Sequence, residues 1–170
     1  MTREDYIKLN EIILEQEEIL RFLRFSNRDA WELGNYLVNK VYETKQELAI
    51  AIRKLNGNIL FQHCTEGTNL NNQNWMKRKF NTVSLMERSS LGAWAVSFIT
   101  DQEIKTHGLS EKDYILCGGG FPIRLKTGEM VAVLTVSNLP HERDHDFIIK
   151  ALTEWLGVDK VPEIDLKMSY

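Results

Sequence analysis

The chain has 170 residues, of which 43% are hydrophobic, 26% charged and 9% aromatic, a composition typical of one globular domain rather than of a disordered chain. Its 21 basic and 24 acidic residues give a formal net charge of −3, which disfavours a nucleic-acid partner because such binders normally carry a basic excess. Two cysteines, no apolar run of membrane-spanning length and an acidic N-terminus unlike a signal peptide predict a cytoplasmic protein with no membrane partner.

Two helices are predicted at the start of the chain. Thr2 and Asp5 have the spacing of a capping box, in which each residue bonds the backbone of the other. Apolar residues then recur near helical spacing over residues 9–23. A second amphipathic helix is predicted to begin at Ser26 or Asn27.

Residues 48–64 predict a β-hairpin. Its first strand is apolar on both faces, and Asn56-Gly57 is typical of a two-residue type I′ turn. That turn sets three cross-strand pairs: Leu55 with Asn58, Ile52 with Phe61, and Ile50 with His63. Because residues opposite each other share a face, His63 is expected to point into an apolar layer.

The second half of the chain predicts helices, a hairpin and a final helix. One helix is expected over residues 74–88 and another from Ser89 or Ser90, before a hairpin at 118–137 and a last helix from about Pro140. This order predicts an α/β (α+β) fold in which a mostly antiparallel sheet lies between two helical layers. The helices between the hairpins should cover one face and the terminal helices the other.

The segment His141–His145 spells H-E-x-x-H, the pattern of many zinc peptidases. Pro140 places this pattern at the start of a helix, so His141 is expected at a fraying, solvent-facing end. Glu142 and Asp144 have a simpler role there, because carboxylates in a first turn complement the helix dipole. The available third ligands are Glu154 and Glu163, and nothing marks either one. A zinc hydrolase is therefore the less favoured alternative, and no metal site is predicted.

His145 shares a helical stripe with apolar residues, so it is expected at the top of a buried face. One interpretation is a core histidine bonded to a neighbouring backbone group. The other is a ligand-facing histidine at the mouth of a pocket, held neutral by the helix N-terminus and able to bind a metal or haem iron. The residues leave both interpretations open.

Four blocks stand in order along the chain: LNGNILFQHC at 55–64, RSS at 88–90, GGGFPIR at 118–124 and VAVLTVSNLPHERDH at 131–145. Together they resemble the GlcG/HbpS-like family, often labelled the haem-degrading domain, and specifically its short single-domain branch. The resemblance covers roughly residues 25–157 and implies a profilin-like fold, a homo-oligomer and, as in some relatives, haem binding. Residues 1–170 are accordingly interpreted as one domain, with an N-terminal helix extension at 1–25, a core at 26–157 and a C-terminal tail at 158–170.

The resemblance places ligand-binding positions at His63, Trp75, Arg78, Lys79, Gly119, Gly120, Ser137, Asp144 and His145. The hairpin histidine, the glycines and the corner after the last strand are expected to converge. Many relatives have histidine directly before the glycines, where this chain has Cys117, so a haem site here would use a thiolate or dispense with that ligand. The glycines either admit a ligand closely or form only a tight turn. The basic run at 77–79 suits an anionic group, a solvated helix face, or a subunit interface anchored by Trp75.

These features predict an oligomeric protein that binds haem or a related small anionic ligand. The alternative is a homo-oligomeric scaffold, suggested by Trp75, the basic run and the acidic first helix. Acyl-transfer chemistry is not expected, because Asp144 and His145 are adjacent on a helix and point about 100° apart, which prevents a relay to Ser137.

Overall fold

The computed structural model describes residues 1–166. Its elements are α1 (Arg3–Ile19), α2 (Asn27–Glu43), β1 (Ala49–Lys54), β2 (Ile59–Cys64), α3 (Leu70–Met86), α4 (Ser90–Thr100), the 3-10 helix η1 (Ile104–His107), β3 (Gly120–Arg124), β4 (Met130–Ser137) and α5 (His141–Leu156). The predicted order of helices and hairpins is confirmed. No helix within the described residues is both long and apolar enough to span a membrane.

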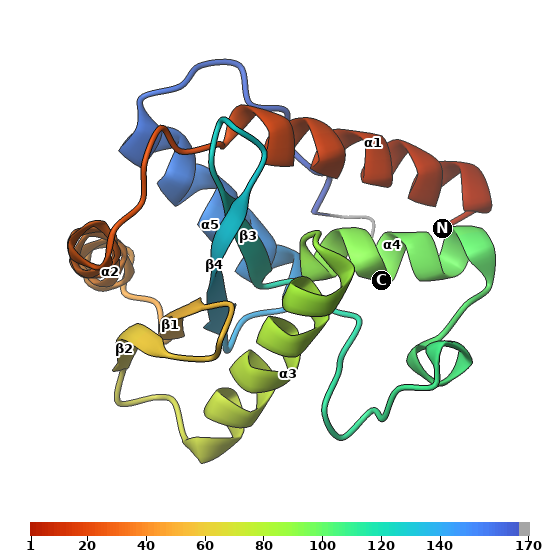
Figure 1. The fold of residues 1–170 in the computed structure, drawn as a ribbon, viewed down its shortest axis with the longest axis horizontal. Helices are drawn as coiled ribbons and strands as arrows, with labels where there is room; N and C mark the ends of the chain where they lie inside the picture. The colour runs from red at the N-terminus through yellow and green to blue at the C-terminus, as the bar shows by residue number, and fades with distance from the viewer. Residues whose placement is uncertain (167–170) are drawn as a thin grey trace.

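The strands form one antiparallel sheet in the order β2-β1-β4-β3. Helix α3 packs on one face of this sheet, and α2 and α5 pack on the other (Figure 1). The predicted antiparallel sheet between helical layers is therefore confirmed.

Helix α1 does not join the layer formed by the other terminal helices. It packs along α4 (Figure 1). Leu9 and Ile13 meet Leu91 and Ala95 there in a small apolar cluster. Ile164 of the C-terminal tail closes the same cluster. Helix α1 is thus held against α4 of its own chain, whereas Phe22, later in the N-terminal extension, bridges Leu125 after β3 and joins the main core.

Both predicted helix starts are confirmed by their capping boxes. The Thr2 backbone N–H donates to Asp5 Oδ2 at 2.7 Å, while the Asp5 N–H donates to the Thr2 hydroxyl. Ser26 and Asp29 repeat the arrangement at α2. These reciprocal bonds satisfy backbone donors that a helix start would otherwise leave open.

The first hairpin has the predicted register but a different turn. The pairs Ile50–His63 and Ile52–Phe61 are both present. At the turn, however, the Lys54 N–H donates to the Asn58 carbonyl, so Lys54 faces Asn58 in place of Leu55. The loop is one residue longer than a two-residue turn, with Gly57 at φ 89°, and an irregularity next to Arg53 restores the register.

Candidate functional site

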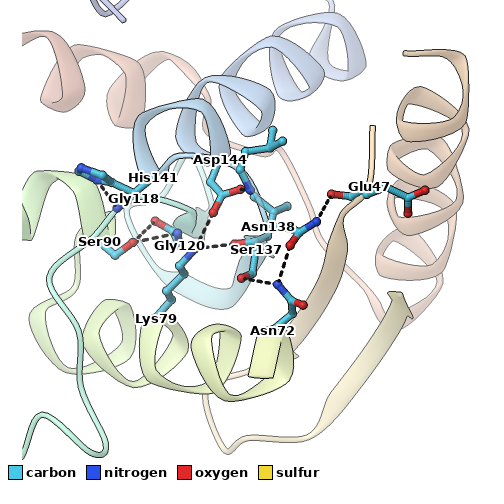
Figure 2. A network of polar contacts seen from close by, with 12 residues as sticks. Glu47, Asn72, Lys79, Ser90, Gly118, Gly120, Ser137, Asn138, His141 and Asp144 are labelled. Carbon is cyan, nitrogen blue, oxygen red and sulfur yellow. Dashed lines mark hydrogen bonds and ion pairs between the residues drawn. The ribbon is translucent and has the colours of Figure 1, made fainter. Parts of the chain in front are cut away.

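A cleft of about 430 Å³ lies where the start of α3 meets the corner between β4 and α5. Its lining consists of Asn69, Asn71, Asn72, Trp75, Lys79, Cys117, Ser137, Asn138, Leu139, His141 and Asp144. Seven of the nine predicted ligand positions lie in or next to this cleft: Trp75, Lys79, Ser137 and Asp144 line it, Gly119 and Gly120 pack beside Lys79, and Arg78 stacks on Trp75. Figure 2 shows the polar network that holds these segments together.

A buried ion pair forms the floor of the cleft. Lys79 lies on the inner stripe of α3 between Met76 and Val83, and only 2% of its surface is exposed. Its ammonium donates to Asp144 Oδ2 at 2.7 Å and to the Val136 carbonyl at 2.8 Å (Figure 2). The basic run at 77–79 is therefore not a fully solvated helix face, because its third residue, Lys79, points inward.

Asp144 connects the ion pair to the start of α5. Its second oxygen, Oδ1, accepts the Leu139 backbone N–H at 3.1 Å. Burial raises the pKa of Asp144 to about 6, because the loss of hydration outweighs the opposing effects of Lys79 and the backbone donors. Asp144 was predicted to complement the dipole of its own helix. It also pairs with the buried Lys79 of α3.

The glycine segment packs directly against the ion pair. Gly119 has φ +102°, and a Cβ at this position would lie 2.6 Å from Lys79 Nζ and 2.6 Å from the Val136 carbonyl oxygen. The Gly120 N–H donates to the Ser90 hydroxyl at 2.8 Å (Figure 2). Atoms of this chain fill the space that the missing side chains leave, which supports the interpretation as a tight turn.

Two asparagines that the sequence analysis did not select organise the other wall. Asn72 donates through Nδ2 to the Ser137 hydroxyl at 3.3 Å and to Asn138 Oδ1 at 3.2 Å. Asn138 in turn donates to the Glu47 carbonyl at 3.0 Å (Figure 2). Asn138 also has φ 141°, a region that residues other than glycine rarely adopt. For Asn72, the available sequence signal was the run of asparagines at 69–74, which spans the start of α3.

His145 lies outside the cleft, in the core. It is fully buried, and its Nε2 bonds Gln16 Oε1 of α1 at 2.9 Å. Gln16 also donates through Nε2 to the Pro162 carbonyl at 2.7 Å, which fixes its oxygen toward the histidine and places the imidazole proton on Nε2. Burial lowers the pKa of His145 to about 3. The core interpretation fits this geometry, although the partner is a side chain and not a backbone group.

His63 does not converge with the other predicted positions. It pairs with Ile50, whereas Ser137 pairs with Ala49, so the alternation of the strands places His63 and Ser137 on opposite faces of the sheet. The half-buried ring packs against α2, with Nε2 3.2 Å from the Tyr42 hydroxyl. The expected convergence of three blocks is therefore wrong for the hairpin histidine and right for the glycines and the corner.

Trp75 and Arg78 lie together beside the cleft. Trp75 is half-buried and lines it, and the Arg78 guanidinium lies 5.0 Å from the centre of the Trp75 ring. Nε of Arg78 is buried and has no hydrogen-bond partner within the described residues. This stacking holds a cationic group close to the cleft mouth.

The H-E-x-x-H pattern does not assemble a metal site. His141 is half-buried, contrary to the expected fraying end, because its Nδ1 accepts the Gly118 N–H at 3.1 Å and its ring packs edge-on against Trp94. His145 instead faces Gln16. Within residues 1–166, no group of three His, Cys, Asp or Glu side chains is arranged to hold a metal ion.

Cys117 also lines the cleft. Burial raises the pKa of its thiol, so the protonated form is favoured over the thiolate. Neither Cys117 nor Cys64 forms a disulfide.

The fold and the cleft define an α/β protein with helices on both faces of a four-stranded antiparallel sheet and a polar site at one sheet–helix corner. The chain belongs to the family described as haem degrading protein HbpS-like, whose model matches residues 25–153. The predicted resemblance is thereby confirmed.

Relatives and solved structures agree with this assignment. A UPF0303 protein of Psychromonas ingrahamii is 38% identical over 144 residues, covering 84% of this chain and 89% of the relative. A UPF0303 protein of Brucella anthropi is 35% identical over 150 residues, with 88% of both chains covered. The crystal structure of Ybr137w matches with a TM-score of 0.80 and 27% identity over 87% of both chains. HbpS matches with a TM-score of 0.63 over 81% of this chain and 94% of its own, and at 16% identity this likeness concerns the fold alone.

Proposed function

We propose that this protein binds a small anionic ligand in the cleft between α3 and the β4–α5 corner. The observation that carries the proposal is the buried pair of Lys79 and Asp144 in the cleft floor. A buried ion pair is often no more stabilising than apolar residues of similar volume. A buried carboxylate with a shifted pKa beside a charged partner in a cleft, as Asp144 is here, marks a candidate functional site.

Lys79 retains a donor for a ligand. A lysine ammonium has three N–H donors, and contacts within the chain occupy two of them, at Asp144 and at the Val136 carbonyl. Because Lys79 lines the cleft, its third donor is available to an oxygen atom of a bound molecule.

The surroundings of the cleft also suit an anion. Asp144 is the only carboxylate among the described residues of the lining, and Lys79 already balances it. Arg78, stacked on Trp75, adds a positive charge without a carboxylate partner in the described residues. Helices α3 and α5 both begin at the cleft, and helix N-termini attract negative groups.

Haem was the other predicted ligand, and a structural neighbour is described as a haem complex of PduOC, with a TM-score of 0.58 and 16% identity. The four histidines of this chain do not fit axial ligation of haem iron in the cleft, and His107 is not among the cleft's lining residues. His63 lies on the other sheet face, and His145 is buried against Gln16. His141 accepts an N–H at Nδ1, which leaves its proton on Nε2. Cys117 is held as a thiol. Haem stays a prediction, and the donor set supports a small anion better.

Calorimetric titration with oxalate and with inorganic phosphate tests the proposal. The wild type should bind at least one of them, and Arg78→Gln should weaken that binding about tenfold through loss of a charge-assisted contact. Lys77→Gln is the matched control, because Lys77 is the exposed neighbour of Arg78 on α3. Absence of binding to either anion, or equal weakening in both variants, would contradict the proposal.

A visible-absorbance titration with haem separates the two ligand classes. Wild type, His63→Ala and His145→Ala should all leave the Soret band of free haem unshifted. A saturable shift in the wild type that one variant abolishes would identify haem as the ligand and name its iron-binding residue.

The homo-oligomer and the scaffold alternative stay predictions. One observation supports them: large apolar side chains are exposed at Leu23 (81%), Leu70 (78%) and Trp31 (57%). Light scattering coupled to size-exclusion chromatography measures the oligomer directly. A monomer at micromolar concentration would rule out both.

A further inference from the structure

The connection between α4 and β3 is unusually long and contains little regular secondary structure. Residues 101–119 contain only the single turn η1, whereas structureless loops rarely exceed about 12–15 residues unless they are functional. The connection leaves the body of the protein beside α4 and returns beside α3 (Figure 1).

Both ends of this connection are fixed. Near its start, the Gln102 N–H donates to the Ser97 carbonyl at 3.0 Å. Near its end, Asn81 donates to the Asp113 carbonyl at 2.8 Å and the Thr82 hydroxyl donates to the Ile115 carbonyl at 2.9 Å. Between these ends the connection is partly packed against the protein, since Ile104 of η1 is buried.

A cavity of about 530 Å³ lies between this connection, the end of α3 and α4. We name it the connector cavity; its lining consists of Leu85, Met86, Arg88, Ala93, Val96, Ser97, Thr100, Gln102, His107, Leu109 and Leu116. Its volume falls within the range of about 300–1,000 Å³ that small-molecule sites occupy. It shares no lining residue with the cleft at Lys79.

The charge of the lining is one-sided. Among the described residues that line it, Arg88 is the only permanently charged one, and none is an aspartate or glutamate. Within residues 1–166 the Arg88 guanidinium forms no hydrogen bond or salt bridge, although Glu17 is close enough to interact with it electrostatically. The Glu17 carboxylate is itself held by the Ser89 N–H at 2.8 Å.

We propose that the connector cavity is a second ligand site, for a small amphipathic carboxylate. The acid group pairs with Arg88, whose planar guanidinium matches a carboxylate with two parallel hydrogen bonds. The apolar part lies against Leu85, Val96 and Leu116. This site does not depend on the function proposed for the cleft.

Calorimetric titration of the full chain with octanoate, and with 1-octanol as its uncharged analogue, tests the site. The wild type should bind octanoate at least about tenfold more tightly than octanol, because only octanoate forms the charge-assisted contact. Arg88→Gln should remove that preference. Arg28→Gln, which alters an exposed arginine on α2, should leave it unchanged.

Two further variants test whether octanoate binds in the connector cavity. Ser97→Trp adds a large ring to the half-buried cavity wall and should weaken both ligands, with folding checked by circular dichroism. Arg78→Gln, at the cleft, should not change octanoate binding, which separates this proposal from the previous one. Failure of octanoate to bind the wild type, or an unchanged preference in Arg88→Gln, would overturn the second site.

Discussion

The two faces of the sheet are built from different kinds of side chain. The face under α2 and α5 presents large aliphatic residues, all fully buried: Ile50, Ile52, Leu134 and Val136 from the strands against Leu33, Leu37, Ile148 and Leu152 from the helices. The face under α3 presents Ala49, Ala51, Thr135 and Ser137 from the two central strands, and Val133 and Met130 at the other end of β4 pack against Phe80 and Val83. The first face is an apolar core, and the second is smaller and more polar.

This difference explains where the polar site forms. Small side chains on the α3 face let the helix lie close to the sheet, so that Lys79 reaches the Val136 carbonyl and Asp144. The aliphatic face excludes such groups, because a buried charge needs a partner and hydrogen bonds to compensate for lost hydration. One face therefore supplies most of the apolar burial, and the other holds the candidate site.

The largest effect is expected from breaking the ion pair on the α3 face. Lys79→Met should lower the free energy of unfolding by about 3–5 kcal/mol, because it leaves Asp144 buried without a counter-charge. The double variant Lys79→Met/Asp144→Asn should recover most of that loss, since the asparagine oxygen still accepts the Leu139 N–H. Urea denaturation measures both. If the double variant is less stable than the single one, the uncompensated charge is not the cause.

A slightly smaller loss is expected on the aliphatic face. Leu37→Ala should cost about 3 kcal/mol, because it removes a fully buried side chain and leaves a cavity. No second, polar substitution should restore the stability that Leu37→Ala loses, in contrast to Lys79→Met. A loss below about 1 kcal/mol in the same urea assay would show that this face tolerates voids and is not a tightly packed core.

Gly119→Ala probes the close packing around the ion pair. Its methyl group would collide with Lys79 Nζ and the Val136 carbonyl, and its φ of +102° is strained for alanine, so we expect a loss of about 2–3 kcal/mol. Gly57→Ala is the matched control, with φ +89° and no atom within 4 Å, and should lose only about 1 kcal/mol. Equal melting temperatures for the two variants would argue against tight packing at Gly119.

The smallest net effect is expected from two opposing pH dependences that largely cancel in the wild type. Burial lowers the pKa of His145 to about 3, so below its ordinary value of 6.5 the unfolded chain binds a proton that the folded protein does not. This contribution reduces stability as pH falls from about 6.5 toward 3. Burial raises the pKa of Asp144 to about 6, so its contribution increases stability as pH falls from about 6 toward 3.8. Each has a slope of about 1.4 kcal/mol per pH unit, and they offset between about pH 4 and 6.

Single substitutions should separate these slopes. In Asp144→Asn, stability should fall as pH decreases from about 6 to 4, because only the His145 contribution remains. In His145→Gln, stability should instead rise over the same interval. Urea midpoints at several pH values measure the slopes relative to wild type. Identical pH profiles for the two variants would mean that neither group titrates as its burial implies.

Local interactions made much of the fold predictable. The capping boxes at Thr2 and Ser26 join residues three apart, so the sequence displays both partners together. The register of the first hairpin was predictable for a similar reason, although the longer turn was not, because the irregularity at Arg53 compensates for it. Matching blocks from 55 to 145 also indicate the family from the sequence alone.

The candidate site was predictable in its residues but only partly in its arrangement. Lys79, Ser137 and Asp144 were selected from the sequence, and the structure brings them to one cleft. His63 was selected with them, but strand alternation directs it to the other face. Asn72 and Asn138 were missed, because amides in a polar loop look like ordinary turn and capping residues until their partners are known.

The sequence by itself determined the order of elements, the helix starts, most of the strand register and the family, since these depend on periodicity and on neighbours a few residues apart. The tertiary structure decided which polar groups meet. Lys79 and Asp144 are 65 positions apart, and His145 and Gln16 are 129 apart, so no local pattern specifies either contact. Their partners were fixed only when packing removed these groups from water and each buried polar atom required a neighbour.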